Sequence, residues 1–250
     1  MKIIHWVLLA VAVWLLLVIK SAPATWAANW VNSAFPGIQI SGVSGSLWRG
    51  RAARVLVLAD GASYSLGEVH WTLRPWTLLM LRPCADITSA LKNQQLEGRA
   101  CGHVDGSWSL SDAQFQGPGA LIGLWLPVQL QGQLSLTLAE LHLDGERVEQ
   151  LRGEARWQNA RFYHNQQWLA LGSYSGQLAA DGAGGASAKL KDSAGPLELK
   201  LTAALPQGQG LSLQGTAAPR AGAPRELAQV FNSLGFSENQ GRYTVDWGTR

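Results

Sequence analysis

The sequence predicts a mainly β protein: a curled, antiparallel, meandering sheet, folded over like half a barrel. A few short helices accompany the sheet, and one N-terminal transmembrane helix precedes it. Three observations predict this fold. One long apolar run opens the chain, apolar and polar residues then alternate with period two, and 28 glycines punctuate the alternating runs. Such alternation is typical of strands with one buried face, and glycines at intervals are typical of turns and bulges.

The apolar run covers Ile3 to Ile19 and is followed by Lys20. A helix rises about 1.5 Å per residue, so a run of this length nearly crosses a bilayer core about 30 Å thick. The alternative is a cleaved signal peptide, because Ala22-Pro23-Ala24 has the small residues typical of a cleavage site. Since the run exceeds the usual signal core, we expect residues 1–21 to be a retained transmembrane anchor.

Residues 22–37 form the juxtamembrane segment. Trp26 and Trp30 are about one helical turn apart, Phe35 follows, and Pro36-Gly37 ends the segment. One interpretation is a helix whose aromatic rings lie at the level of the lipid headgroups. The alternative is that these rings pack onto the domain that follows.

Alternation begins at residue 38 and is clearest around residues 128–143. Apolar residues take one parity from Val128 to Leu138, whereas Gln, Ser and Thr take the other. Leu141 and Leu143 continue the apolar set with shifted parity, which predicts a bulge near Ala139-Glu140.

We expect one periplasmic β domain over residues 38–250. Residues 45–52 and 153–161 both place a Trp inside a strand rich in Gly, Arg and Ala. This echo suggests two related halves that meet near residue 127.

Three short stretches show helical patterns instead, at residues 75–81, 120–125 and 224–234. In the third, apolar residues recur at i, i+3, i+4 and i+7 from Leu227 to Leu234, and Gly235 is a natural C-terminal cap. We expect these helices to cover open edges or ends of the sheet.

The two cysteines, Cys84 and Cys101, lie in two predicted strands joined by a turn near Lys92-Asn93. An even cysteine count in an exported domain favours a disulfide, which implies an oxidising compartment such as the bacterial periplasm. The alternative is two unrelated buried thiols.

Composition and motifs exclude several classes of function. Only 15% of residues are charged, the net charge is +3, and the basic residues are scattered, so no nucleic-acid partner is expected. The five histidines show no metal-ligand spacing, and no nucleophile elbow, phosphate loop or close carboxylate pair is present. We therefore expect no catalytic residue, no metal and no cofactor.

Two sequence blocks carry a family resemblance: ISGVSGSLWRGRA at residues 40–52 and GEVHWTLRPWTLL at residues 67–79. With residues 234–245 and the N-terminal apolar run, they resemble protein N of the type II (general) secretion pathway of Gram-negative bacteria. The resemblance implies a non-enzymatic, single-pass inner-membrane accessory component whose bulk faces the periplasm. Its partners would be other inner-membrane components of the secretion machine. The family also looks related to AsmA-like proteins, whose curled sheets have an apolar groove associated with lipid transport.

The expected function is therefore support of protein export from the periplasm across the outer membrane, through protein contacts in the assembly. Candidate contact residues are Trp48, Trp71, Trp76 and Trp125; the alternative for each is a place in the core. A second hypothesis is an AsmA-like protein that holds phospholipid acyl chains on its apolar sheet face. A periplasmic hydrolase is a third and much weaker hypothesis, because no catalytic set is visible.

Overall fold

The structure is a computed structural model that describes residues 5–6, 14, 20–34, 37–59, 62–124, 129–224, 226–227, 229, 231 and 236–248. Within these residues, no helix has the length and apolarity that crossing a membrane requires. Most of the predicted anchor, Ile3 to Ile19, lies outside the described residues, as does the proposed meeting point of two halves near residue 127.

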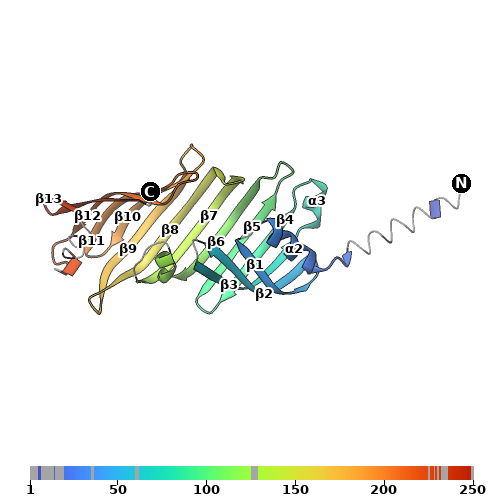
Figure 1. Cartoon of the computed structure of the whole chain (residues 1–250), viewed down its shortest axis with the longest axis horizontal. Coiled ribbons are helices and arrows are strands. Elements are labelled where there is room, and N and C mark those ends of the chain that lie inside the picture. Colours follow the sequence, from blue (N-terminus) through green and yellow to red (C-terminus); the bar gives the residue numbers. More distant parts are fainter. Residues whose placement is uncertain are drawn as a thin grey trace. The chain divides into compact units, whose positions relative to one another are not determined.

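The prediction of a mainly β, antiparallel, meandering chain is confirmed (Figure 1). Three helical elements are α2 (Ala24–Ala34), α3 (Pro75–Leu79) and the 3₁₀ helix η1 (Gly119–Leu124). The first seven strands are β1 (Ile38–Gly45), β2 (Arg49–Ala59), β3 (Ala62–Leu73), β4 (Cys84–Leu91), β5 (Gln94–Gly102), β6 (Trp108–Pro118) and β7 (Leu130–Asp144). The other seven are β8 (Arg147–His164), β9 (Gln167–Ala180), β10 (Ala186–Ala194), β11 (Leu197–Leu205), β12 (Ser212–Pro219), β13 (Ser237–Asn239) and β14 (Arg242–Gly248).

The fourteen strands form one open sheet in which each strand pairs with its sequence neighbours as far as β12. The order then becomes β12-β14-β13, so β1 and β13 are the two edges. By their internal contacts the residues divide into two compact units, Met1–Lys92 and Asn93–Arg250, called the N-terminal and C-terminal units below.

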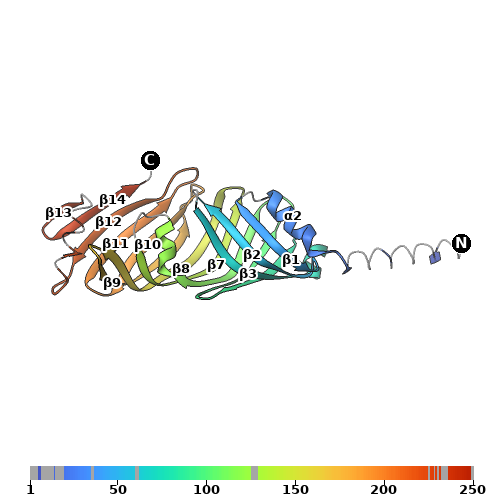
Figure 2. The ribbon, with the colours of Figure 1, turned by 60° about the horizontal axis from the view of Figure 1, so that its bottom comes forward.

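In the N-terminal unit, α2 lies beside the edge strand β1 (Figure 2) and protects it. The side-chain oxygen of Asn32 accepts a hydrogen bond from the backbone N–H of Ile40 at 3.1 Å, so one edge donor of β1 is satisfied. Ala24 and Ala28 of α2 are buried, whereas the side chain of Trp26 is largely exposed. The predicted juxtamembrane helix is thus present; the side chains of Trp30 and Phe35 lie outside the described set.

In the C-terminal unit, strands β6 to β12 lie side by side in chain order (Figure 1). The bulge predicted near Ala139-Glu140 is confirmed, because the register of β7 against β8 shifts between Leu138 and Glu140. The shift explains why Leu141 and Leu143 keep facing apolar partners despite their changed parity: Leu141 pairs with Leu151, and Leu143 with Val148.

Each of the three predicted helical stretches contains helix, although Met80, Leu81 and Pro224, which lie within the predicted stretches, are not helical. Pro75 starts α3, η1 covers residues 119–124, and residues 226, 227, 229 and 231 are helical. The last stretch packs against the sheet of the C-terminal unit through Leu227 and Phe231. Leu227, at 1% exposure, is the largest fully buried side chain among the described residues.

Candidate binding surfaces

One face of the C-terminal unit carries a continuous line of small and apolar residues, which we call the apolar row. The row crosses nine strands, and each of its residues lies directly opposite the next one on the neighbouring strand. Directly opposed residues on neighbouring strands share a face, so the members form one surface. The apolar row consists of Leu96, Phe115, Leu136, Ala155, Gly176, Leu190, Leu201, Gly215 and Val245.

The end of the apolar row near β14 is covered by Phe231, one of the described helical residues 226, 227, 229 and 231. Val245 is buried in a cluster with Tyr174 and Leu197, against which Phe231 packs. The ring of Phe231 also stacks on Tyr243, with centroids 4.9 Å apart.

Trp157 and η1 cover a neighbouring part of the same unit. The indole N–H of Trp157 donates to the carbonyl of Gln131 at 3.2 Å, and its ring lies 5.8 Å from that of Tyr174. A Cβ placed on Gly119 would lie 2.6 Å from the Trp157 indole nitrogen, so only glycine lets η1 approach this ring so closely.

Four members of the apolar row are incompletely covered. Phe115, Leu136, Leu190 and Leu201 are each only partly buried. Apolar side chains at this intermediate exposure still present surface to water, and further apolar contact would bury it favourably.

The opposite face is polar and carries an open hollow lined by Ser135, Thr137, Ala139, Arg152, Gly153, Glu154 and Arg156. Two hydrogen bonds, at 2.9 and 3.1 Å, join the Arg156 guanidinium to the Glu154 carboxylate. The hydrogen bond from Arg156 lowers the pKa of Glu154. Glu154 neutralises only one of the two arginines that line the hollow, so the lining keeps one net positive charge, that of Arg152.

An acidic group sits at the β10–β11 end of the C-terminal unit. The Asp192 carboxylate accepts hydrogen bonds from the backbone N–H of Leu199 and from the guanidinium of Arg220. Burial acts to raise the pKa of Asp192, but these two donors outweigh it and hold that pKa below its ordinary value. Burial, with the nearby Asp192 charge adding to it, raises the pKa of Tyr174.

The structure also brings together two histidines that sequence spacing did not connect. The rings of His103 and His142 meet edge to face, with centroids 5.3 Å apart. His103 contacts the Ser109 hydroxyl at 3.1 Å, and His142 lies 3.4 Å from Glu149. Across the part of the chain that the structure describes, no group of three His, Cys, Asp or Glu could hold a metal ion.

The tryptophans named as candidate contacts fall into different environments. Trp48 and Trp71 are half-buried and belong to the β2–β3 end of the N-terminal unit, where the indole N–H of Trp71 donates to the carbonyl of Leu47 at 3.1 Å. Trp76, on α3, is 76% exposed and is not a core residue. Trp125 lies outside the described residues. A role of any of the four in partner binding stays a prediction.

The hairpin predicted around the cysteines is present, with β4 starting at Cys84, β5 ending one residue after Cys101, and Lys92-Asn93 at the turn. Both cysteines are disulfide-bonded, and since the chain has only two, the bond joins them.

These features define a class: a mainly β protein with one open antiparallel sheet, whose C-terminal unit has one apolar and one polar face. The model of the family "Type II secretion system (T2SS), protein N" matches residues 36–246, which is most of the chain. The chain therefore belongs to the protein N family of type II secretion systems.

Three relatives carry the name "Type II secretion system protein N". The chain is 25% identical to that of Klebsiella pneumoniae, over 96% of this chain and 93% of the relative. It is 26% identical to that of Aeromonas hydrophila, over 85% and 84%. It is 29% identical to that of Vibrio cholerae, over 55% of each. No solved structure matches the chain significantly.

Proposed function

We propose that the chain is a non-enzymatic, inner-membrane accessory component of a type II secretion system, with its β domain in the periplasm. The observation that carries this proposal is the family match over residues 36–246, supported by relatives that align along nearly the whole chain. The apolar run from Ile3 to Ile19 supplies the anchor, and the disulfide suits an oxidising periplasm.

The sheet works by contacting other components of the secretion machine. Its two edges differ in how well they are protected. At the β1 edge, the side-chain oxygen of Asn32 in α2 accepts a hydrogen bond from one backbone N–H of the strand. At the other edge, β13 is three residues long and each of its residues is exposed. Among the described residues, β14 pairs with β13 only at residues 242–244, so Val245–Gly248 has no strand on that side. An extended segment of a partner can add there by strand pairing.

Affinity isolation from the native host tests this function. The tagged protein is extracted in a mild detergent, and the proteins and lipids that accompany it are identified by mass spectrometry. Enrichment of other type II secretion components, with no lipid excess over an unrelated single-pass protein, supports the assembly role. Absence of those components from repeated cross-linked isolations would overturn it.

The partly buried apolar row favours a second candidate function, binding of phospholipid acyl chains as in AsmA-like proteins. This function predicts stoichiometric phospholipid in the purified protein. Leu136→Gln, on the apolar row, should then lower the bound lipid, whereas Thr137→Gln, one residue along the same strand on the polar face, should not. Equal lipid content in both variants and the parent would exclude the apolar row as a lipid site.

A further inference from the structure

The connection between β3 and β4 exposes an unusual amount of apolar side chain. Trp76, Leu79, Met80 and Leu81 are 76%, 78%, 78% and 68% exposed, and Leu78 is also exposed. We call residues 76–81 the apolar turn. Contiguous exposed apolar groups of this size mark interaction sites, because water solvates them unfavourably.

The apolar turn is held in shape at its base. The Thr77 hydroxyl donates to the carbonyl of Arg74 at 2.6 Å and accepts from the N–H of Cys84 at 3.0 Å. The N–H of Arg82 donates to the carbonyl of Thr77 at 3.0 Å, and the Arg74 side chain pairs with Asp86 at 2.7 Å. These bonds close the base, and the apolar side chains of residues 76 and 78–81 are exposed above this ordered base, so their exposure is a feature of the fold.

A short chain of backbone hydrogen bonds places the apolar turn beside the residues that follow the N-terminal apolar run. The N–H of Leu47 donates to the carbonyl of Ala22 at 2.8 Å, and the N–H of Leu73 donates to the carbonyl of Trp48 at 2.8 Å. Leu73 is the last residue of β3, and the next residue, Arg74, occupies the N-cap position of α3. The start of α2 and the apolar turn therefore share one end of the N-terminal unit.

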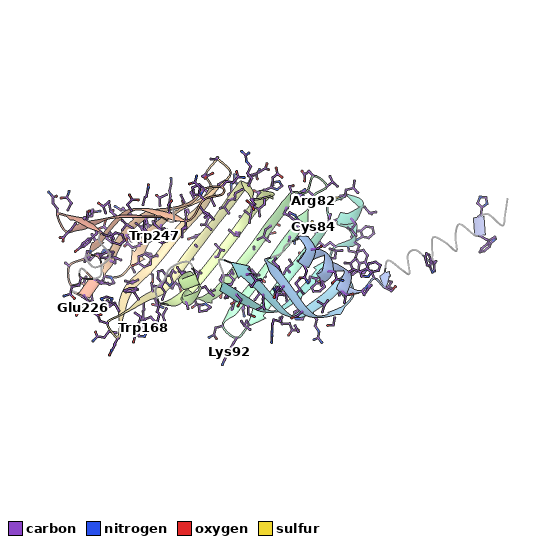
Figure 3. The ribbon with its side chains drawn as sticks, in the orientation of Figure 1. Arg82, Cys84, Lys92, Trp168, Glu226 and Trp247 are labelled. Atoms are coloured by element: carbon purple, nitrogen blue, oxygen red, sulfur yellow. The ribbon has the colours of Figure 1, made fainter. Side chains whose placement is uncertain are left out.

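Among the described residues, the far end of the same unit exposes two large apolar side chains, Leu58 and Leu91, each separately and each less exposed than Trp76. In Figure 3, Arg82 and Cys84 lie at one end of β4 and Lys92 follows its other end. Eight residues of strand separate the two ends by about 25 Å.

Charge at the apolar-turn end favours a lipid surface over a protein partner of mixed charge. Residues 20–24, 45–50 and 72–86 contain four cations, Lys20, Arg49, Arg74 and Arg82, and one carboxylate, Asp86. A net positive charge at the same end as exposed Trp and aliphatic groups is typical of interfacial membrane segments, where apolar groups enter the headgroup boundary and cations meet lipid phosphates.

We propose that the apolar turn, residues 76–81, inserts into the same bilayer leaflet at which the N-terminal anchor ends. This inference rests on the proposed membrane anchor, because Lys20 at the end of the apolar run then lies at the bilayer surface. Ala22 and Pro23 follow Lys20 by two and three residues. Ala22 accepts a backbone hydrogen bond from Leu47, and Pro23 forms a β-bridge with Ser46, so only a few residues separate the sheet from the membrane. Together, the anchor and the apolar turn give the N-terminal unit two points of contact with the lipid and fix its orientation at the surface.

The test uses the full chain in a bilayer of phosphatidylethanolamine and phosphatidylglycerol, with a fluorophore attached to one introduced thiol. Both native cysteines are disulfide-bonded and do not take up the label. The reporter variant is Leu79→Cys, and its matched control is Leu91→Cys, an exposed leucine at the opposite end of β4. Leu9→Cys reports on the anchor separately. Quenching by phospholipids with brominated acyl chains is compared with quenching by aqueous iodide.

The inference predicts strong lipid quenching and weak iodide quenching for the labels at Leu9 and Leu79, and the reverse for Leu91. If Leu9 is quenched by lipid but Leu79 behaves like Leu91, the inference is overturned and the anchor stands. If only Leu79 is quenched by lipid, the apolar turn contacts the membrane but the anchor proposal fails. Iodide quenching at both Leu9 and Leu79 would overturn the two proposals together.

Discussion

The guanidinium of Arg220, just beyond the end of β12, hydrogen-bonds the carboxylate of Asp192 on β10, two strands away. The Asp192 side chain is only 9% exposed, and its second oxygen accepts the backbone N–H of Leu199 at 3.0 Å. Arg220 also donates to the carbonyl of Gly195, at 3.0 Å, from its other terminal nitrogen. This arrangement ties together β10, the β10–β11 turn, β11 and the segment after β12.

This pair predicts a loss of stability in acid. The pKa of Asp192 is lowered in the folded state, so its contribution to stability is complete above the ordinary carboxyl value of about 3.9. As the pH falls from about 3.9 through the lower pKa that Asp192 has in the folded protein, the carboxylate becomes protonated and its contribution to stability is lost. Asp192→Ala removes both acceptors, leaves the Leu199 N–H unpaired, and should cost about 2 kcal/mol at neutral pH.

Urea unfolding of the parent and the variant at neutral pH and near pH 3 measures this contribution. The difference between the two proteins should shrink in acid. Asp192→Asn keeps an acceptor for Leu199 and should lose less stability than Asp192→Ala. A difference between parent and Asp192→Ala that is independent of pH would contradict the charge-based explanation.

The helical segment that covers the sheet near β14 should depend on a single side chain. Leu227 is fully buried against Leu169, Phe162 and Leu171, so Leu227→Ala should destabilise the C-terminal unit by about 3 kcal/mol. Leu205→Ala, at an exposed position on β11, is the matched control and should change the free energy of unfolding by less than about 0.5 kcal/mol. Thermal melting followed by circular dichroism compares the two, and equal shifts would mean that Leu227 is not a packing anchor.

The disulfide gives a chemical prediction. The unfolded, unreduced protein should show no free thiol to a labelling reagent. Replacing both Cys84 and Cys101 with Ser should lower the free energy of unfolding by about 3 kcal/mol in the chain-entropy model. The reason is that the bond restricts the conformations available to the unfolded chain, and this restriction is lost in the variant. Complete labelling without reductant would disprove the bond and weaken the argument for an oxidising compartment.

Much of the fold was predictable because period-two alternation is a local property. The bulge near Ala139-Glu140 follows from the parity change between Leu138 and Leu141, and the register confirms it. The helix around Leu227 follows from 3.6-residue spacing and a glycine cap, which are also local signals.

The surfaces were less predictable because they depend on which strands meet. His103 and His142 become neighbours only through the pairing of Ser109 with His142. Residues 76–81 are as apolar as a typical core segment, so their sequence suggests burial. In the structure, no described element covers them. Their exposure depends on how Thr77 and Arg74 close the base of the turn.

Trp71 and Trp76 are five residues apart, yet they should respond oppositely to substitution. Trp71 covers Gly50, where an added Cβ would overlap the indole ring, and its indole N–H donates to the Leu47 carbonyl. Trp71→Ala should therefore lower the free energy of unfolding by about 2 kcal/mol, since it removes packing and a hydrogen bond. Trp76→Ala should change it by less than about 0.5 kcal/mol, because the side chain is already in solvent in the isolated protein. Denaturant unfolding in mild detergent, followed by far-ultraviolet circular dichroism, separates the two. A loss for Trp76→Ala as large as that for Trp71→Ala would show that Trp76 packs within the protein, and the exposed apolar turn would no longer be available to a membrane.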